Sequence, residues 1–178
     1  RSLVGSEMCI RDRYDLSTGI YVGGRYGGTH YSARKAKIEG GYIYNLIGGP
    51  LSSDNRSGVN DIYIYMTGGS VDIIIGGAGT TATYGNRIVS VTGGTVNYSV
   101  FGGSNGSTGN EGDGTLNGTP YIYIGGTATI GDKNLISNNT TLFGAESGSV
   151  FGIGNGRSGY STIAVSYTHL TLPTNSLV

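Results

Sequence analysis

Residues 61–77, DIYIYMTGGSVDIIIGG, and residues 86–103, NRIVSVTGGTVNYSVFGG, decide the fold of this chain. Each segment contains a short run rich in Ile, Val, Tyr or Ser, a Gly-Gly pair, a second such run and another Gly-Gly pair. Runs of this length and composition indicate β-strands and are too short for amphipathic helices. Glycine pairs adopt backbone angles that are closed to other residues, so we expect the chain to turn a corner at each pair.

The pattern is an internal repeat. Related units occupy residues 37–49, 121–131 and, in decayed form, 146–152. First glycine turns recur every 23 to 32 residues, at Gly40, Gly68, Gly93, Gly125 and near Gly148. A period in this range is typical of stacked repeats rather than of a closed globule. We therefore predict an all-β fold, specifically a parallel β-solenoid of about five rungs.

Alternation along the strands predicts which side chains point inward, because successive residues of a strand face opposite sides. In the first strand of residues 61–77, Ile62, Ile64 and Met66 share the inward face, and tyrosines occupy the outward face. In the second strand we expect Val71, Ile73 and Ile75 inside. The outward positions there are Asp72 and Ile74. In the next repeat the inward residues are Val89, Val91 and Val96, and we expect burial to begin after Arg87.

Both ends of the chain resemble translated transposon adapters of sequencing libraries. The matching segments are residues 3–12, LVGSEMCIRD, and residues 165–174, VSYTHLTLPT. The resemblance implies that residues 1–13 and 164–178 are adapter-derived and that residues 14–163 are a β-solenoid repeat fragment of a longer protein. Segments of this kind are set aside in fold reasoning, so we expect neither end to join the core.

Composition excludes several classes of function. The chain has 11 basic and 11 acidic residues and no basic stripe, so no nucleic-acid partner is expected. Its single cysteine, Cys9, lies in the adapter-like end, which leaves no thiol chemistry or disulfide for residues 14–163. No apolar run is long enough to cross a bilayer, so no membrane span is expected.

The units MTGGSV…IGG (residues 66–77) and VTGGTV…FGG (residues 91–103) resemble the glycine-rich β-solenoid repeats of very large bacterial cell-surface and adhesin-like proteins. The likeness covers about residues 20–156. It implies a non-enzymatic structural or adhesive segment of a bacterial surface or secreted protein, located extracellularly or at the cell surface. Glycans or host and cell-surface molecules are then the expected partners.

The outward tyrosines are the candidate ligand-binding residues, because aromatic faces suit the apolar side of a sugar ring. The candidate glycan-binding residues are Tyr63, Tyr65, Tyr121 and Tyr123; Tyr42 and Tyr44 share the outward pattern. Tyrosine is also a good strand residue that packs along ladders, and we favour this plainer interpretation.

No catalytic residue, metal site or cofactor is predicted. The loop of residues 104–118 is rich in Asn and acidic side chains, but it lacks the spacing of known calcium motifs, so we interpret it as a turn-rich loop. Asp54, Asp61, Asp72 and Asp113 stand alone, and His30 has no partner in a recognisable motif. The alternative is a β-helix carbohydrate-active enzyme or carbohydrate-binding module, which converging carboxylates would favour.

Overall fold

The computed structural model describes residues 6–10, 15–16, 19–22, 33–49, 61–79, 83–105, 116–138, 141–142, 145–154 and 164–165. Most of these residues are in β-strands, and one short helix, α1 (Lys133–Ser137), is present among them. The predicted all-β class is confirmed. No helix among these residues is long and apolar enough to cross a membrane.

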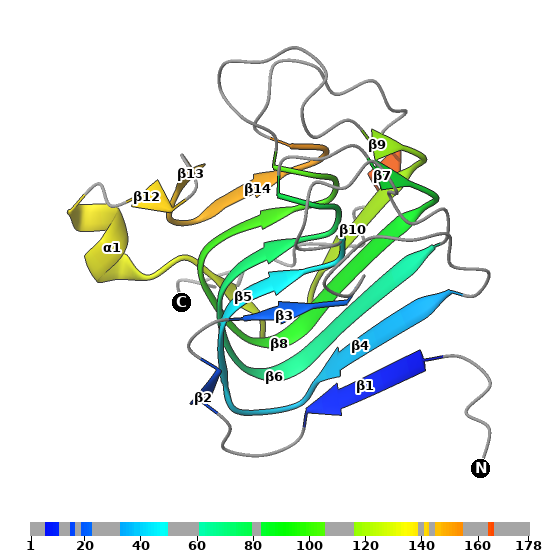
Figure 1. Ribbon diagram of the computed structural model, residues 1–178. Coiled ribbons are helices and arrows are strands. Elements are labelled where there is room, and N and C mark those ends of the chain that lie inside the picture. Colours follow the sequence, from blue (N-terminus) through cyan, green and yellow to red (C-terminus); the bar gives the residue numbers. More distant parts are fainter. Residues whose placement is uncertain are drawn as a thin grey trace, which may run out of the picture.

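The described strands form an 11-stranded sheet whose main order is β1-β4-β6-β8-β10-β15. Its members are β1 (Ser6–Ile10), β2 (Asp15–Leu16), β3 (Ile20–Tyr21), β4 (Arg34–Ile38), β5 (Tyr42–Ile47), β6 (Ile62–Ile75), β8 (Arg87–Phe101), β10 (Pro120–Ile124), β11 (Thr129–Ile130), β14 (Ser149–Phe151) and β15 (Ala164–Val165). Every pairing in this sheet is parallel. Figure 1 shows the strands of successive repeats lying side by side.

Glycine pairs bend the long strands in the middle and divide the sheet into two arms (Figure 1). The first arm contains β1, β4, β10, β15 and the first halves of β6 and β8. The second arm contains β2, β3, β5, β11, β14 and the second halves of β6 and β8. At the bend, Gly69 and Gly94 have φ angles of 81° and 80°. Only glycine adopts this left-handed region without strain, so the predicted corners are confirmed.

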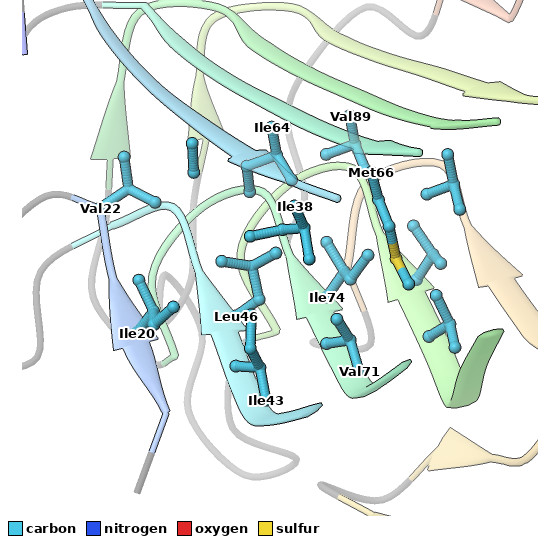
Figure 2. Close-up of a cluster of buried hydrophobic side chains, with 14 of the residues drawn as sticks. Ile20, Val22, Ile38, Ile43, Leu46, Ile64, Met66, Val71, Ile74 and Val89 are labelled. Carbon is cyan, nitrogen blue, oxygen red and sulfur yellow. The ribbon is translucent and has the colours of Figure 1, made fainter. Parts of the chain in front are cut away.

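The main hydrophobic core lies between the two arms. Ile64, Met66 and Val89 contribute from the first arm, and Val71 and Ile74 contribute from the second, all fully buried. Figure 2 shows these side chains pointing toward one another across the space between the arms. Repeats share this column because equivalent residues stand in register, as in the pairing of Ile64 with Val89. The predicted inward face of the first strand is therefore confirmed.

The prediction for the second strand was wrong about Ile74, which was expected outside but joins the main core. Ile73 and Ile75 are buried as predicted, but they form a second cluster with Phe101 instead of sharing the core of Val71. The register shifts between Val71 and Ile73, where β8 places an extra residue opposite β6. Such an irregularity changes the phase of the alternation, so every later residue of the strand faces the other side.

Arg87 also differs from expectation, because burial in β8 begins with this residue. Its side chain is 1% exposed and stands in register with Ile62. The guanidinium donates to the carbonyl oxygens of Tyr84, at 2.7 Å, and Asn86, at 2.9 Å. These bonds offset part of the cost of burying a charge. Burial lowers the pKa of Arg87 to about 10, and nearby Asp61 opposes that shift.

The decayed copy at residues 146–152 is not a fifth separate unit. Its strand β14 pairs with the second half of β8, matching Val150 to Val100 and Phe151 to Phe101. β11 pairs with an earlier part of the same half of β8, matching Ile130 to Val96. Between β11 and β14 the chain inserts α1 and the antiparallel pair β12 (Thr141–Leu142) and β13 (Ala145–Glu146). The fourth repeat is therefore interrupted and then resumed.

Both ends contribute strands, contrary to the expectation that they stay apart from the core. β1 pairs with β4 over five residues, and β15 pairs with β10 over two. The next two strands in the sequence, β2 and β3, pair with β5. The physical reason is that an exposed sheet edge offers unpaired backbone groups to any extended segment.

At the second glycine corner, glycine is required because the backbones of neighbouring repeats approach closely, and not because of left-handed φ angles. A Cβ atom on Gly48 would collide with the carbonyl oxygen of Gly76, one on Gly76 with Gly102, and one on Gly102 with Gly152. Backbone bonds cross this corner from repeat to repeat: Gly48 N donates to Ile75 O at 2.7 Å and Gly76 N to Phe101 O at 2.8 Å. The four glycines form one column, named here the glycine column.

Candidate ligand-binding face

The four predicted glycan-binding tyrosines lie on the outer side of the first arm. Tyr63 and Tyr65 come from β6, and Tyr121 and Tyr123 come from β10. Along β6 the tyrosines alternate with core residues, since Ile62, Ile64 and Met66 are buried. Strand alternation thus places the tyrosines outward as the sequence predicts. We call this surface the tyrosine face.

Within the tyrosine face, the side chains of one pair lie against each other. The rings of Tyr63 and Tyr65 stack with centroids 6.3 Å apart and planes inclined by 16°. Tyr121 is 42% exposed and Tyr123 is 40% exposed, so both present ring surface to solvent. Broad, partly exposed aromatic rings with a polar hydroxyl suit contacts to ligands that have both apolar and polar surfaces.

The two tyrosine pairs are separated by one strand. β8 stands between them and places Ile88 in register with Tyr63 and Tyr121, and Ser90 in register with Tyr65 and Tyr123. Two strand spacings in a sheet measure roughly 9.6 Å, so each tyrosine lies about that far from its counterpart. Strand alternation in the sequence also places Ile88 and Ser90 outward, although neither was predicted to bind a ligand.

Asp61 orders the start of the tyrosine face. Its carboxylate accepts hydrogen bonds from the backbone N–H of Asn86, at 2.7 Å, and from the hydroxyl of Tyr63, at 3.5 Å. The Asn86 side chain in turn accepts from the backbone N–H of Thr119, at 3.1 Å. Partial burial, and then the Asp61 charge, raise the pKa of Tyr63. This phenol therefore stays protonated at neutral pH and remains able to donate.

Cations stand at the N-terminal side of the tyrosine face. Lys35 and Lys37 of β4 are in register with Tyr63 and Tyr65. Lys35 is exposed, and Lys37 forms an ion pair with Glu39 in which nitrogen and oxygen are 2.6 Å apart. The two lysines thus continue the tyrosine columns onto β4.

Tyr42 and Tyr44 do not belong to the tyrosine face, because they lie on β5 in the second arm. The Tyr42 hydroxyl donates to Asp72 at 2.8 Å, and the Asn97 amide donates to the other carboxylate oxygen at 2.6 Å. Asn97 also donates to Ser70 at 3.3 Å. Asp72 thus connects three successive repeats. We call this set of side chains the Asp72 bridge.

Among the described residues, no three His, Cys, Asp or Glu side chains gather as a set of metal ligands. Asp61 and Asp72 lie on different arms of the sheet, and each accepts hydrogen bonds from neighbouring repeats. His30, Asp54, Asp113 and residues 106–115 of the Asn-rich loop lie outside the described residues.

Comparison of the chain with protein-family models, with curated proteins and with solved structures found no match. Any functional assignment therefore rests on the repeat architecture and on the geometry of the tyrosine face.

Proposed function

We propose that this chain is part of a parallel β-solenoid that acts as a structural or adhesive segment of a bacterial surface or secreted protein. Support for the solenoid comes from the return path of each repeat. After the glycine column, β7 (Thr83–Tyr84) pairs in parallel with β9 (Leu116–Asn117) of the following repeat. Successive repeats thus stack along three segments, which is how a coil of rungs is built.

The tyrosine face is the observation that carries the adhesive part of the proposal. Its aromatic side chains repeat at fixed positions of a rigid sheet, so several weak contacts can form at once with an extended ligand. Glycans are the proposed ligands, since tyrosine pairs an apolar ring with a hydroxyl. The repeats act without catalysis, and the proposed location is extracellular or at the cell surface.

A carbohydrate-binding module is the alternative that the same surface favours. A carbohydrate-binding module would make the same contacts between tyrosines and glycan. It would differ from the adhesive scaffold only in the activity of the longer protein that carries it. A β-helix enzyme would need two carboxylates flanking one bond. Asp61 and Asp72, on separate arms and hydrogen-bonded to the neighbouring repeats, do not provide that pair.

A glycan array probed with the wild-type chain and with two double variants tests the proposal. Tyr63→Ala/Tyr65→Ala and Tyr121→Ala/Tyr123→Ala should each weaken binding by about tenfold, because two aromatic contacts are worth roughly 1–3 kcal/mol together. Tyr84→Ala is the matched control, since Tyr84 is 42% exposed but lies on β7. We expect this variant to bind like wild type.

Two results would contradict the proposal. Binding that persists in both double variants would remove the tyrosine face as the site. Measurable depolymerisation of a polysaccharide by the wild-type chain would replace the scaffold function with an enzymatic one.

A further inference from the structure

The C-terminal end of the stack exposes residues that are buried at equivalent positions elsewhere. Val150 of β14 is 46% exposed, whereas its register partners toward the N-terminus, Val100 and Ile74, are fully buried. Further aliphatic side chains at this end are only partly buried against the main core, namely Ile122, Ile124, Ala128 and Ile130. We call this surface the end face.

The opposite end of the same column is covered. Ile20 of β3, in register with Leu46, is 7% exposed, and neighbouring Val22 is 8% exposed. This column is therefore covered at its N-terminal end and open at its C-terminal end. Its residues are Ile20, Leu46, Ile74, Val100 and Val150. Terminal units of stacked-repeat proteins need a polar outer face, whereas the described residues of the end face are aliphatic.

The backbone at the end face is also open to pairing. Among the described strands, β11 and β14 pair only with β8. β10 pairs on its outer side with β15, which covers Tyr121 and Ile122 alone. In that short contact Val165 stands in register with Ile122.

We infer that the end face is a docking surface for a further repeat supplied by the same polypeptide. The surface is continuous with the interface between repeats, so the same contacts specify the occupant. It must place aliphatic side chains opposite Ile122, Ile130 and Val150. Gly152 leaves room for the occupant's carbonyl oxygen, because a Cβ atom on each earlier glycine of the glycine column would meet a carbonyl oxygen of the repeat on its C-terminal side. The inference rests on the proposed stacked architecture and is independent of glycan binding.

A replacement of equal length tests the inference. Residues 162–178 are exchanged for a copy of residues 86–102, which places the copied Val89 at position 165, opposite Ile122. The amides of Ile130, Val150 and Phe151 should then exchange with deuterium at least about tenfold more slowly. The control carries the same copy with two of its inward valines, the copies of Val89 and Val96, changed to Asp.

The control keeps the length of the copy but cannot fill the column, so it should exchange like the unaltered chain. Equal protection by both copies would overturn the inference. So would a dimer of the unaltered chain that Val150→Lys dissociates in sedimentation velocity, since the occupant would then be a second copy. If the amides of β6 and β8 in the unaltered chain exchanged as fast as those of an unfolded peptide, the stacked architecture itself would be overturned.

Discussion

Gly76 shows how a single residue sets the distance between repeats. Its φ angle lies outside the left-handed region, so conformational freedom is not the reason for glycine here. The reason is contact: its Cα faces the carbonyl oxygen of Gly102, leaving no room for a side chain. Because the opposing atom belongs to the backbone, it cannot move aside without breaking the ladder between Gly76 N and Phe101 O.

Gly76→Ala should therefore lower the free energy of unfolding by about 3 kcal/mol, the cost of forced overpacking. Gly79→Ala is the matched control, since a Cβ atom at Gly79 would meet nothing within 4 Å. We expect that substitution to change stability by less than about 0.5 kcal/mol. Urea unfolding followed by circular dichroism measures both. A smaller loss at Gly76 than at Gly79 would show that the glycine column does not set the spacing.

Strands of the second arm are joined by side chains as well as by backbone. In the Asp72 bridge one carboxylate accepts from Tyr42 of the repeat before it and from Asn97 of the repeat after it. The sequence interpretation placed Asp72 outward, where substitutions usually change stability little. The outward placement agrees with the structure, in which Asp72 is partly exposed. Because its carboxylate accepts two hydrogen bonds from neighbouring repeats, we expect its substitution to destabilise the fold more than an ordinary surface substitution does.

Asp72→Ala should destabilise the fold by about 1–3 kcal/mol, since two donors in partly buried surroundings lose an acceptor. Thr129→Ala, on the same arm and exposed, should cost less than about 0.5 kcal/mol. Chemical denaturation of the two variants beside wild type provides the comparison. If Tyr42→Phe and Asp72→Ala were fully additive in a double-mutant cycle, the hydrogen bond between them would contribute nothing.

The elements show what the sequence could and could not predict. Alternation placed Ile64 and Val89 correctly, and glycine pairs located the corners, because both signals are local. Ile74 was misassigned, since the register shift after Val71 depends on the neighbouring strand. Arg87 was misjudged for a different reason: the carbonyl oxygens of Tyr84 and Asn86 in the preceding turn accept hydrogen bonds from its guanidinium and make its burial tolerable.

In the whole molecule, the tyrosine pairs were predicted to be outward, but their spacing was not. That spacing requires knowing that β8 lies between β6 and β10. The fourth repeat was also divided wrongly, because the inserted α1 hides the connection between β11 and β14 in the sequence. Long-range pairing therefore decided both of these features.

The two chain ends should contribute unequally to stability. Deleting residues 1–13 removes the five-residue pairing of β1 with β4, whereas deleting residues 164–178 removes a two-residue pairing. We expect the first deletion to lower the melting temperature by about 5–10 °C and the second by less than about 3 °C, on the scale of net hydrogen-bond energies. Thermal unfolding by circular dichroism distinguishes them. Equal melting temperatures for wild type and both deletions would show that neither end belongs to the folded unit.

The interrupted fourth repeat has a consequence for engineering. After leaving the sheet at Gly131, the chain passes through α1, β12 and β13 and returns at Ser149 in register with Ser99. The position of β14 is dictated by the template beside it and not by the length of peptide that precedes it. Loops at this point can therefore be exchanged for foreign peptides of different length, which makes the junction a natural site for grafting epitopes or affinity tags.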